Sequence, residues 1–159
     1  MQTGAIRVVL SVLMMSLALA AQAEMAPREG WVVLDSAKAY GQLVDDVKAA
    51  VKANKMGVVT QAGPTGAAKN RGITIPGNRV IGVFNNRYAV RILGLSTAAM
   101  IEAPIRLYVT ENEDGTATLS YKMPSTVFAP YMSEADADLG VAAGELDAIF
   151  LAIAEMAVQ

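Results

Sequence analysis

The sequence contains neither cysteine nor histidine, and aromatic side chains make up only 6% of it. Without thiols the chain has no disulfide and no cysteine for a lipoprotein anchor. Without imidazoles it has no Ser-His-Asp or Cys-His nucleophile system, no histidine-ligated metal and no c-type haem attachment. The carboxylates that remain lack the spaced ligand set of a calcium loop. We therefore expect no cofactor, no metal site and no catalytic residue.

An apolar run from Val8 to Ala20 lies near the N-terminus, with Arg7 as the single charge ahead of it. Ala21 and Ala23 then supply the small residues that precede a signal-peptidase cut. The run is too short to span a bilayer as a retained helix. We predict a signal peptide over 1–23, a flexible lead over 24–30 and a single domain over 31–159. The mature protein is then periplasmic or secreted and free of the membrane.

Charge is distributed unevenly along the chain. Ten basic residues lie from Lys38 to Arg106 against three acidic ones, whereas from Leu107 onward Lys122 stands alone against nine acids. Such segments can simply be solvated surfaces of local sign. They can also form a basic face that attracts an anionic ligand. Nucleic acid is not an expected partner, because the net charge is −2 and the chain has no basic run.

The first predicted strand covers 31–34. A helix follows, capped by Asp35 or Ser36, because apolar residues recur at helical spacing along one stripe. The stripe consists of Tyr40, Leu43, Val44, Val47 and Val51. A second strand is predicted over 58–61.

A loose segment over 62–77, with one helical turn at 66–70, separates the second strand from a third over 79–84. Asn85 or Asn86 can cap a helix that runs through Leu95. Ser96 can cap a short turn that ends before Pro104.

Residues 105–111 and 116–122 alternate apolar and polar side chains and predict a hairpin. A two-residue turn would mix the two faces. A three-residue loop with Gly115 in the left-handed conformation pairs Val109 with Leu119 and keeps one face apolar, so we favour it. The opposite, polar face then shows Arg106, Tyr108, Thr110, Thr118, Ser120 and Lys122.

Residues 133–136 resemble a capping box, and a second apolar stripe predicts a final helix behind it. The stripe consists of Leu139, Val141, Leu146, Ile149, Phe150, Ile153 and Ala157. Strands with one apolar face and helices with broad apolar faces imply an α+β fold, a two-layer sandwich.

Five segments of the chain carry a family pattern through their order and spacing. They are 50–59, 67–72, 79–86, 102–109 and 119–124. Together they resemble the family called domain of unknown function 302. The resemblance implies a curved antiparallel sheet with helices packed on one face, often in a homodimer. It implies no reaction, because the family has no assigned function.

The chain departs from that family pattern at two places. Members often carry an Asp-His pair soon after the second strand, where this chain has Ala62-Gly63. They often show Gly-Asn-Pro after the third strand, where this chain has Asn85-Asn86-Arg87. A histidine-dependent chemistry of the family would therefore be missing here.

The function we favour from the sequence is a non-catalytic, exported module that binds a small molecule or anion. Its ligand would lie near the loop over 66–72 and the helix that starts at 85–86, where backbone N–H groups and cations can hold an anion. The candidate ligand-binding residues are Lys69, Arg71, Asn85, Asn86, Arg87, Arg91, Arg106 and Tyr121.

Two alternatives stay open. A second protomer or another partner could cover the polar sheet face, which would make this a dimerising or partner-binding domain. An enzyme without histidine could instead use a carboxylate, lysine or tyrosine. That reading requires a cleft that brings Glu102 near Arg106, Lys69 or Tyr121.

Overall fold

The computed structural model describes residues 25–133, 135 and 137–159, so the predicted signal peptide lies outside the described residues. Five antiparallel strands form one sheet in the order β1-β5-β4-β3-β2. The strands are β1 (Trp31–Ala39), β2 (Gly57–Ala62), β3 (Asn78–Phe84), β4 (Ile105–Glu111) and β5 (Thr116–Lys122).

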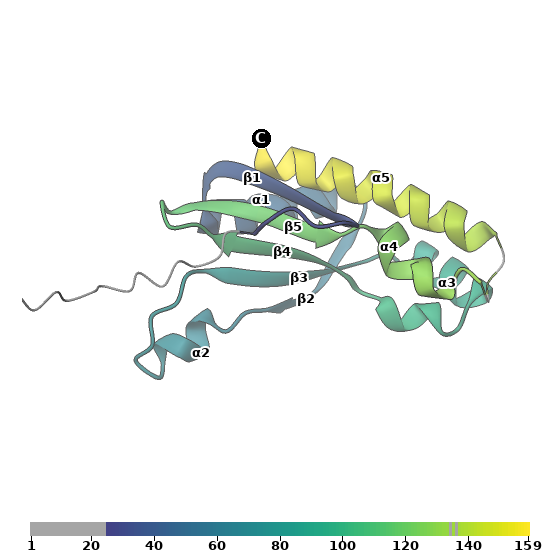
Figure 1. Ribbon diagram of the computed structural model, residues 1–159, viewed down its shortest axis with the longest axis horizontal. Coiled ribbons are helices and arrows are strands. Elements are labelled where there is room, and N and C mark those ends of the chain that lie inside the picture. Colours follow the sequence, from purple (N-terminus) through teal and green to yellow (C-terminus); the bar gives the residue numbers. More distant parts are fainter. Residues whose placement is uncertain (1–24, 134, 136) are drawn as a thin grey trace, which may run out of the picture.

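Helices alternate with these strands along the chain. They are α1 (Tyr40–Ala53), α2 (Thr65–Lys69), α3 (Asn86–Leu95), α4 (Pro124–Phe128) and α5 (Asp138–Val158), with short 3₁₀ helices η1 (Ala99–Glu102) and η2 (Ala129–Tyr131). α1 and α5 pack against each other and cover one face of the sheet, whereas α2 lies on an arm beyond β2 and β3 (Figure 1). The expected α+β architecture is confirmed. Among the described helices, none has the length and apolar character needed to cross a bilayer.

The core lies between the sheet and the α1–α5 layer. Strand register brings the apolar side chains of β3, β4 and β5 onto the same face, where they are almost fully buried. They are Ile81, Val83, Ile105, Leu107, Val109, Ala117, Leu119 and Tyr121. α1 and α5 contribute Leu43, Val47, Val51, Leu146, Phe150 and Ile153 to this core. Burial of each large side chain contributes roughly 1.5–3 kcal/mol to folding.

The hairpin prediction is confirmed. Val109 pairs with Leu119 and Leu107 pairs with Tyr121. Gly115 has a φ of 82°, which a glycine adopts without steric cost. Asp114 fixes the loop because its Oδ1 accepts the Thr116 backbone N–H at 2.9 Å.

The predicted cap of α1 is wrong. β1 continues through Asp35 and Ser36 to Ala39, and Ala39 is the N-cap, without a side-chain hydrogen bond. The side chains of both predicted caps instead form hydrogen bonds with distant parts of the chain. The Thr118 hydroxyl lies 2.9 Å from Asp35 Oδ1, and the Ser36 hydroxyl donates to the Val158 carbonyl at 3.2 Å.

The predicted capping box before the last helix is also wrong. α5 begins at Asp138, and its N-cap is Ala137, which makes no side-chain cap. Two members of the box, residues 134 and 136, lie outside the described residues. The segment between Met123 and Met132, for which no element was predicted, holds α4 and η2.

The two caps near α3 are confirmed. Asn85 Oδ1 accepts the backbone N–H of Arg87 at 2.9 Å, and the Ser96 hydroxyl accepts the Ala99 N–H at 3.1 Å. The Asn85 amide also donates to the Lys55 carbonyl at 2.9 Å, which ties the start of α3 to the turn before β2.

The sheet face opposite the helices, called the open face below, carries the polar side chains of the hairpin. The lead over 25–30 turns back at Gly30 and crosses this face (dark purple in Figure 1). The Gly30 carbonyl accepts the Met123 N–H at 2.9 Å, which holds the turn. Thr118 and Ser120, on this face, are 1% and 0% exposed, although none of the described helices packs on it.

Candidate functional site

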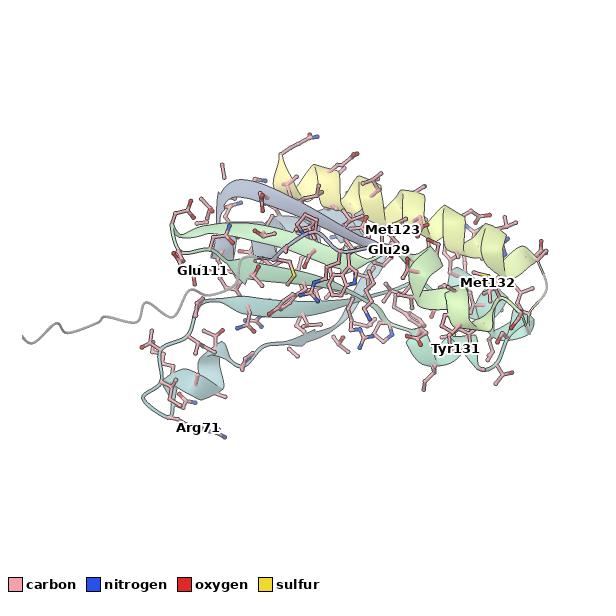
Figure 2. The ribbon with its side chains drawn as sticks, in the orientation of Figure 1. Glu29, Arg71, Glu111, Met123, Tyr131 and Met132 are labelled. Carbon is pink, nitrogen blue, oxygen red and sulfur yellow. The ribbon has the colours of Figure 1, made fainter. Side chains whose placement is uncertain are left out.

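The structure does not bring the candidate ligand-binding residues into one site. Lys69 and Arg71 lie on the α2 arm, which follows β2, whereas Asn85, Asn86 and the arginines behind them follow β3. Because β2 and β3 are antiparallel neighbours and α2 lies between them in the chain, these groups occupy opposite ends of the two strands. Arg71 projects from the arm, far from the α3 end of the molecule (Figures 1 and 2).

The α3 end forms a small polar cluster. Arg91 Nη1 and the Tyr88 hydroxyl both reach Glu145 Oε2 of α5, at 2.9 and 3.0 Å. The Arg91 contact, followed by that of Tyr88, holds the pKa of Glu145 below its usual value. Burial, and then the nearby Glu145 carboxylate, raises the pKa of Tyr88. Arg91 is therefore engaged within the protein, while Arg87 and Asn86 stay exposed.

Tyr121 belongs to the core. It is 2% exposed, and its ring centroid lies 5.7 Å from that of Phe150 on α5. Burial raises the pKa of the Tyr121 hydroxyl well above its usual value, and the charges of Asp147 and Glu155 raise it further. This tyrosine is therefore neutral at physiological pH, and its side chain packs under the helices.

The most site-like feature is a groove of about 780 Å³ that runs over the open face, called the open-face groove below. Its walls come from all five strands and from the segments that follow β2 and precede β4. The lining residues are Trp31, Ala62, Gly63, Pro64, Asn78, Val80, Glu102, Ile105, Arg106, Tyr108, Tyr121, Lys122 and Val127. A volume of this size suits a small organic ligand.

Strand register explains why the groove carries two cations. Leu107 and Tyr121 form a pair that faces the helices, so the next residues along the two strands, Arg106 and Lys122, both face the groove. Trp31 pairs with Lys122, and the Lys122 ammonium lies 5.7 Å from the Trp31 ring centroid. Among the described residues neither Arg106 nor Lys122 has an ion-pair partner.

A carboxylate borders the same groove. Glu102 ends η1, just before β4, and its Oε1 accepts the Tyr131 hydroxyl at 2.7 Å. The enzyme alternative required a cleft shared by Glu102 with Arg106, Lys69 or Tyr121. The groove brings Glu102 together with Arg106 but not with Lys69, and the Tyr121 side chain belongs to the core on the other face.

A second hollow, of about 890 Å³, occupies the other end of the open face and shares Asn78 and Tyr108 with the groove. Its charged residues are all acidic: Asp35, Glu111, Glu113 and Asp114. Glu111 Oε2 accepts the Gly77 N–H at 2.6 Å. The Thr116 hydroxyl, followed by its backbone N–H, lowers the pKa of Asp114.

Glu111 and Asp35 thus link distant segments at this end of the sheet, and Asp114 fixes the hairpin loop. Within the part of the chain that the structure describes, no three acidic side chains come close enough to hold a metal ion. Glu111 marks the acidic end of the open face and Tyr131 marks the end with the groove (Figure 2).

The sequence pattern found part of this groove. The alternation in the hairpin placed Arg106, Tyr108 and Lys122 on one polar face, and the register confirms it. This alternation missed Trp31, and Glu102 entered the sequence analysis only through the enzyme alternative. Trp31 joins the face only through the pairing of β1 with β5, and Glu102 only through the position of η1. No local pattern reports either contact.

Comparison with known proteins agrees with this architecture. A search of curated proteins gave no match. Among solved structures, the fold is similar to the crystal structure of an uncharacterized conserved protein DUF302 from Bacillus stearothermophilus. The TM-score is 0.71 at 18% sequence identity, over 82% of this chain and 99% of that one. The model of the family described as domain of unknown function DUF302 matches residues 32–153. The chain therefore belongs to the DUF302 family.

Proposed function

We propose that the open-face groove binds a small amphipathic anion, with an apolar body and a carboxylate or phosphate head, and performs no reaction on it. The observation that carries the proposal is the pair of cations, Arg106 and Lys122. They border the groove without a carboxylate partner among the described residues. Ion pairing occupies Arg91 and two of the lysines elsewhere on the surface.

The chemistry of the lining supports an anionic head on an apolar body. An arginine guanidinium presents parallel N–H donors that match a carboxylate or phosphate, and lysine adds a point charge. Val80, Pro64 and Val127 offer apolar surface next to these cations. The Trp31 ring holds Lys122 beside the groove, because an ammonium is attracted to the face of an indole.

Caproate, with hexanol as its neutral counterpart, tests the proposal. Caproate should raise the melting temperature of the protein and shift amide resonances of β4 and β5, since a ligand that binds the native state stabilises it. Hexanol should do so much less. Arg106→Gln should weaken caproate binding about tenfold or more. A hydrogen bond to a charged group contributes about 1.5–3 kcal/mol, and 1.4 kcal/mol is tenfold.

Arg71→Gln is the matched control, because it removes the same charge from an exposed site on the α2 arm. An equal loss of affinity in both variants would show that net charge, and not the groove, attracts caproate. Light scattering on the same samples tests the competing occupant of the open face. A dimer that dissociates on Arg106→Gln, with no response to caproate, would support a partner-binding domain instead.

We also propose that binding takes place outside the cytoplasm. The support is the signal-peptide pattern over 1–23. Intact mass and N-terminal sequencing of the exported protein should give a chain that starts at Glu24. A cytoplasmic product that retains Met1 would contradict this proposal.

A further inference from the structure

We propose that the open-face groove selects an amphoteric ligand, in which Glu102 holds an amino group at the end opposite the anionic head. This inference rests on the proposed anion-binding function and adds a specificity residue to it. The geometry that carries it is a carboxylate and a guanidinium that line the same groove without pairing with each other.

The charges of Glu102 and Arg106 do not pair with each other. Glu102 and Arg106 have opposite charges and lie four residues apart, at the start of β4. The ion pairs among the described residues join Lys38 to Asp46, Lys48 to Asp45 and Arg91 to Glu145, and none joins Glu102 to Arg106. Two opposite charges that border one groove and stay apart leave space for a ligand that meets both.

The orientation of Glu102 leaves one of its carboxylate oxygens for a ligand. The Tyr131 hydroxyl donates to Oε1 at 2.7 Å and fixes the carboxylate against η2. Among the described residues no donor reaches the other oxygen, Oε2. A carboxylate accepts hydrogen bonds and donates none, so a ligand group that satisfies it must carry N–H or O–H. An ammonium forms the stronger, charge-assisted bond.

The groove also offers apolar surface to a ligand. Pro64, Val80 and Val127 give the groove apolar lining beside the two charges, and residues 103–105 separate Glu102 from Arg106 along the chain. The two Cα atoms can be at most about 14 Å apart, because an extended chain advances no more than roughly 3.6 Å per residue. The ligand is therefore a short apolar chain with an ammonium at one end and an anion at the other.

A series of three probes of equal chain length tests this inference: ε-aminocaproate, caproate and hexylamine. Titration calorimetry should give about tenfold tighter binding of ε-aminocaproate than of caproate to the unaltered protein. Glu102→Gln should reverse that preference, so that caproate binds more tightly than ε-aminocaproate. Desolvation of an ammonium without a carboxylate partner costs binding free energy, whereas caproate has no ammonium to desolvate. Caproate should bind this variant at least as tightly as the unaltered protein, because the change removes a carboxylate that repels the anion.

Two further variants sharpen the result. Tyr131→Phe removes the hydroxyl that orients Glu102, so it should reduce the preference partly, and it tests Tyr131 as a positioning residue. Glu113→Gln, in the acidic hollow, is the matched control and should keep the full preference. Melting temperatures of all variants verify folding, and the Glu102→Gln amide remains able to accept the Tyr131 hydroxyl.

The outcomes separate this inference from the function on which it rests. Equal binding of caproate and ε-aminocaproate would overturn the role of Glu102 and leave the anion site standing. A preference that survives Glu102→Gln would overturn it as well. Absence of binding by all three probes would overturn the proposed function itself. Tighter binding of hexylamine than of caproate would show that the groove is a cation site.

Discussion

On the helix-covered face of the sheet, Leu107, Val109 and Leu119 are fully buried, whereas their sequence neighbours on the open face include the exposed Arg106. The covered face is uniform, and every large side chain packs against α1 or α5. The open face is divided, with cations and Trp31 around the groove and carboxylates at the other end. One face thus stabilises the protein, and the other carries Arg106 and Lys122, which have no ion-pair partner among the described residues.

The largest expected effect comes from the covered face. Leu119→Ala should lower the free energy of unfolding by about 2–5 kcal/mol, because it leaves a cavity in a closely packed core. Arg106→Ala, on the neighbouring strand of the open face, should change it by no more than about 0.5 kcal/mol. Urea denaturation of both variants measures the contrast. Similar losses in the two would mean that the open face also carries packing energy.

One position on the open face should nevertheless be as sensitive as the core. A Cβ on Gly82 would overlap the Thr60 hydroxyl and lie 2.9 Å from Pro104 Cγ. We expect Gly82→Ala to destabilise the protein by about 1–3 kcal/mol. Gly144→Ala, in α5, meets nothing within 4 Å and should stabilise it by roughly 0.5–1 kcal/mol. Thermal unfolding gives both values, and equal signs would contradict the prediction.

Two buried hydroxyl groups, those of Thr118 and Ser120, give a smaller contrast within the open face. The Thr118 hydroxyl lies 2.9 Å from Asp35 Oδ1 and 3.1 Å from Asn112 Oδ1, whereas the buried Ser120 hydroxyl has no partner among the described residues. Thr118→Val should cost about 1–2 kcal/mol, and Ser120→Ala should be neutral or stabilising. Denaturant midpoints measure both. A large loss for Ser120→Ala would show that its hydroxyl is hydrogen-bonded in solution.

The smallest expected effect comes from the ion pair of Arg91 and Glu145. The Arg91 contact lowers the pKa of Glu145 in the folded protein. The stability that the pair contributes is therefore present above the unfolded pKa of about 4.3 and is lost as the pH falls through the lower, folded pKa. Glu145→Gln and Arg91→Gln should each be less stable than the unaltered protein at pH 7 and lose that difference in acid. A difference that persists in acid would assign the effect to packing.

Local patterns predicted most elements because the physical cause of each is local. The α1 stripe, the Asn85 cap and the hairpin loop ending at Gly115 depend on residues within a few positions of one another. The predicted caps at Asp35 and Ser36 failed for a non-local reason. Both side chains have partners that lie far along the chain, Thr118 and the Val158 carbonyl, and these extend β1 to Ala39.

The candidate site shows the same division. Alternation along the hairpin identified Arg106 as a residue of the polar face, and the register confirms that position. The arginines and asparagines after β3 were grouped with Lys69 and Arg71 by sequence proximity and charge. Antiparallel pairing of β2 with β3 separates the two groups by the length of a strand. The two groups are close in sequence, but β3 lies between them and carries the chain away from the arm.

Periodicity in the sequence predicted the buried apolar face of α1 and of the hairpin strands, since that face depends on a period of two or 3.6 residues. It did not predict that Thr118 and Ser120 are buried or that Val141 is exposed. The sequence also determined that thiol and imidazole chemistry is missing, because a chain without cysteine and histidine has neither group in any fold. Only the tertiary structure decided which polar residues meet. Pairing of β1 with β5 brings Trp31 beside Lys122, and the position of η1 brings Glu102 into the groove with Arg106. Contacts between distant segments depend on strand order and register, and no single segment encodes these.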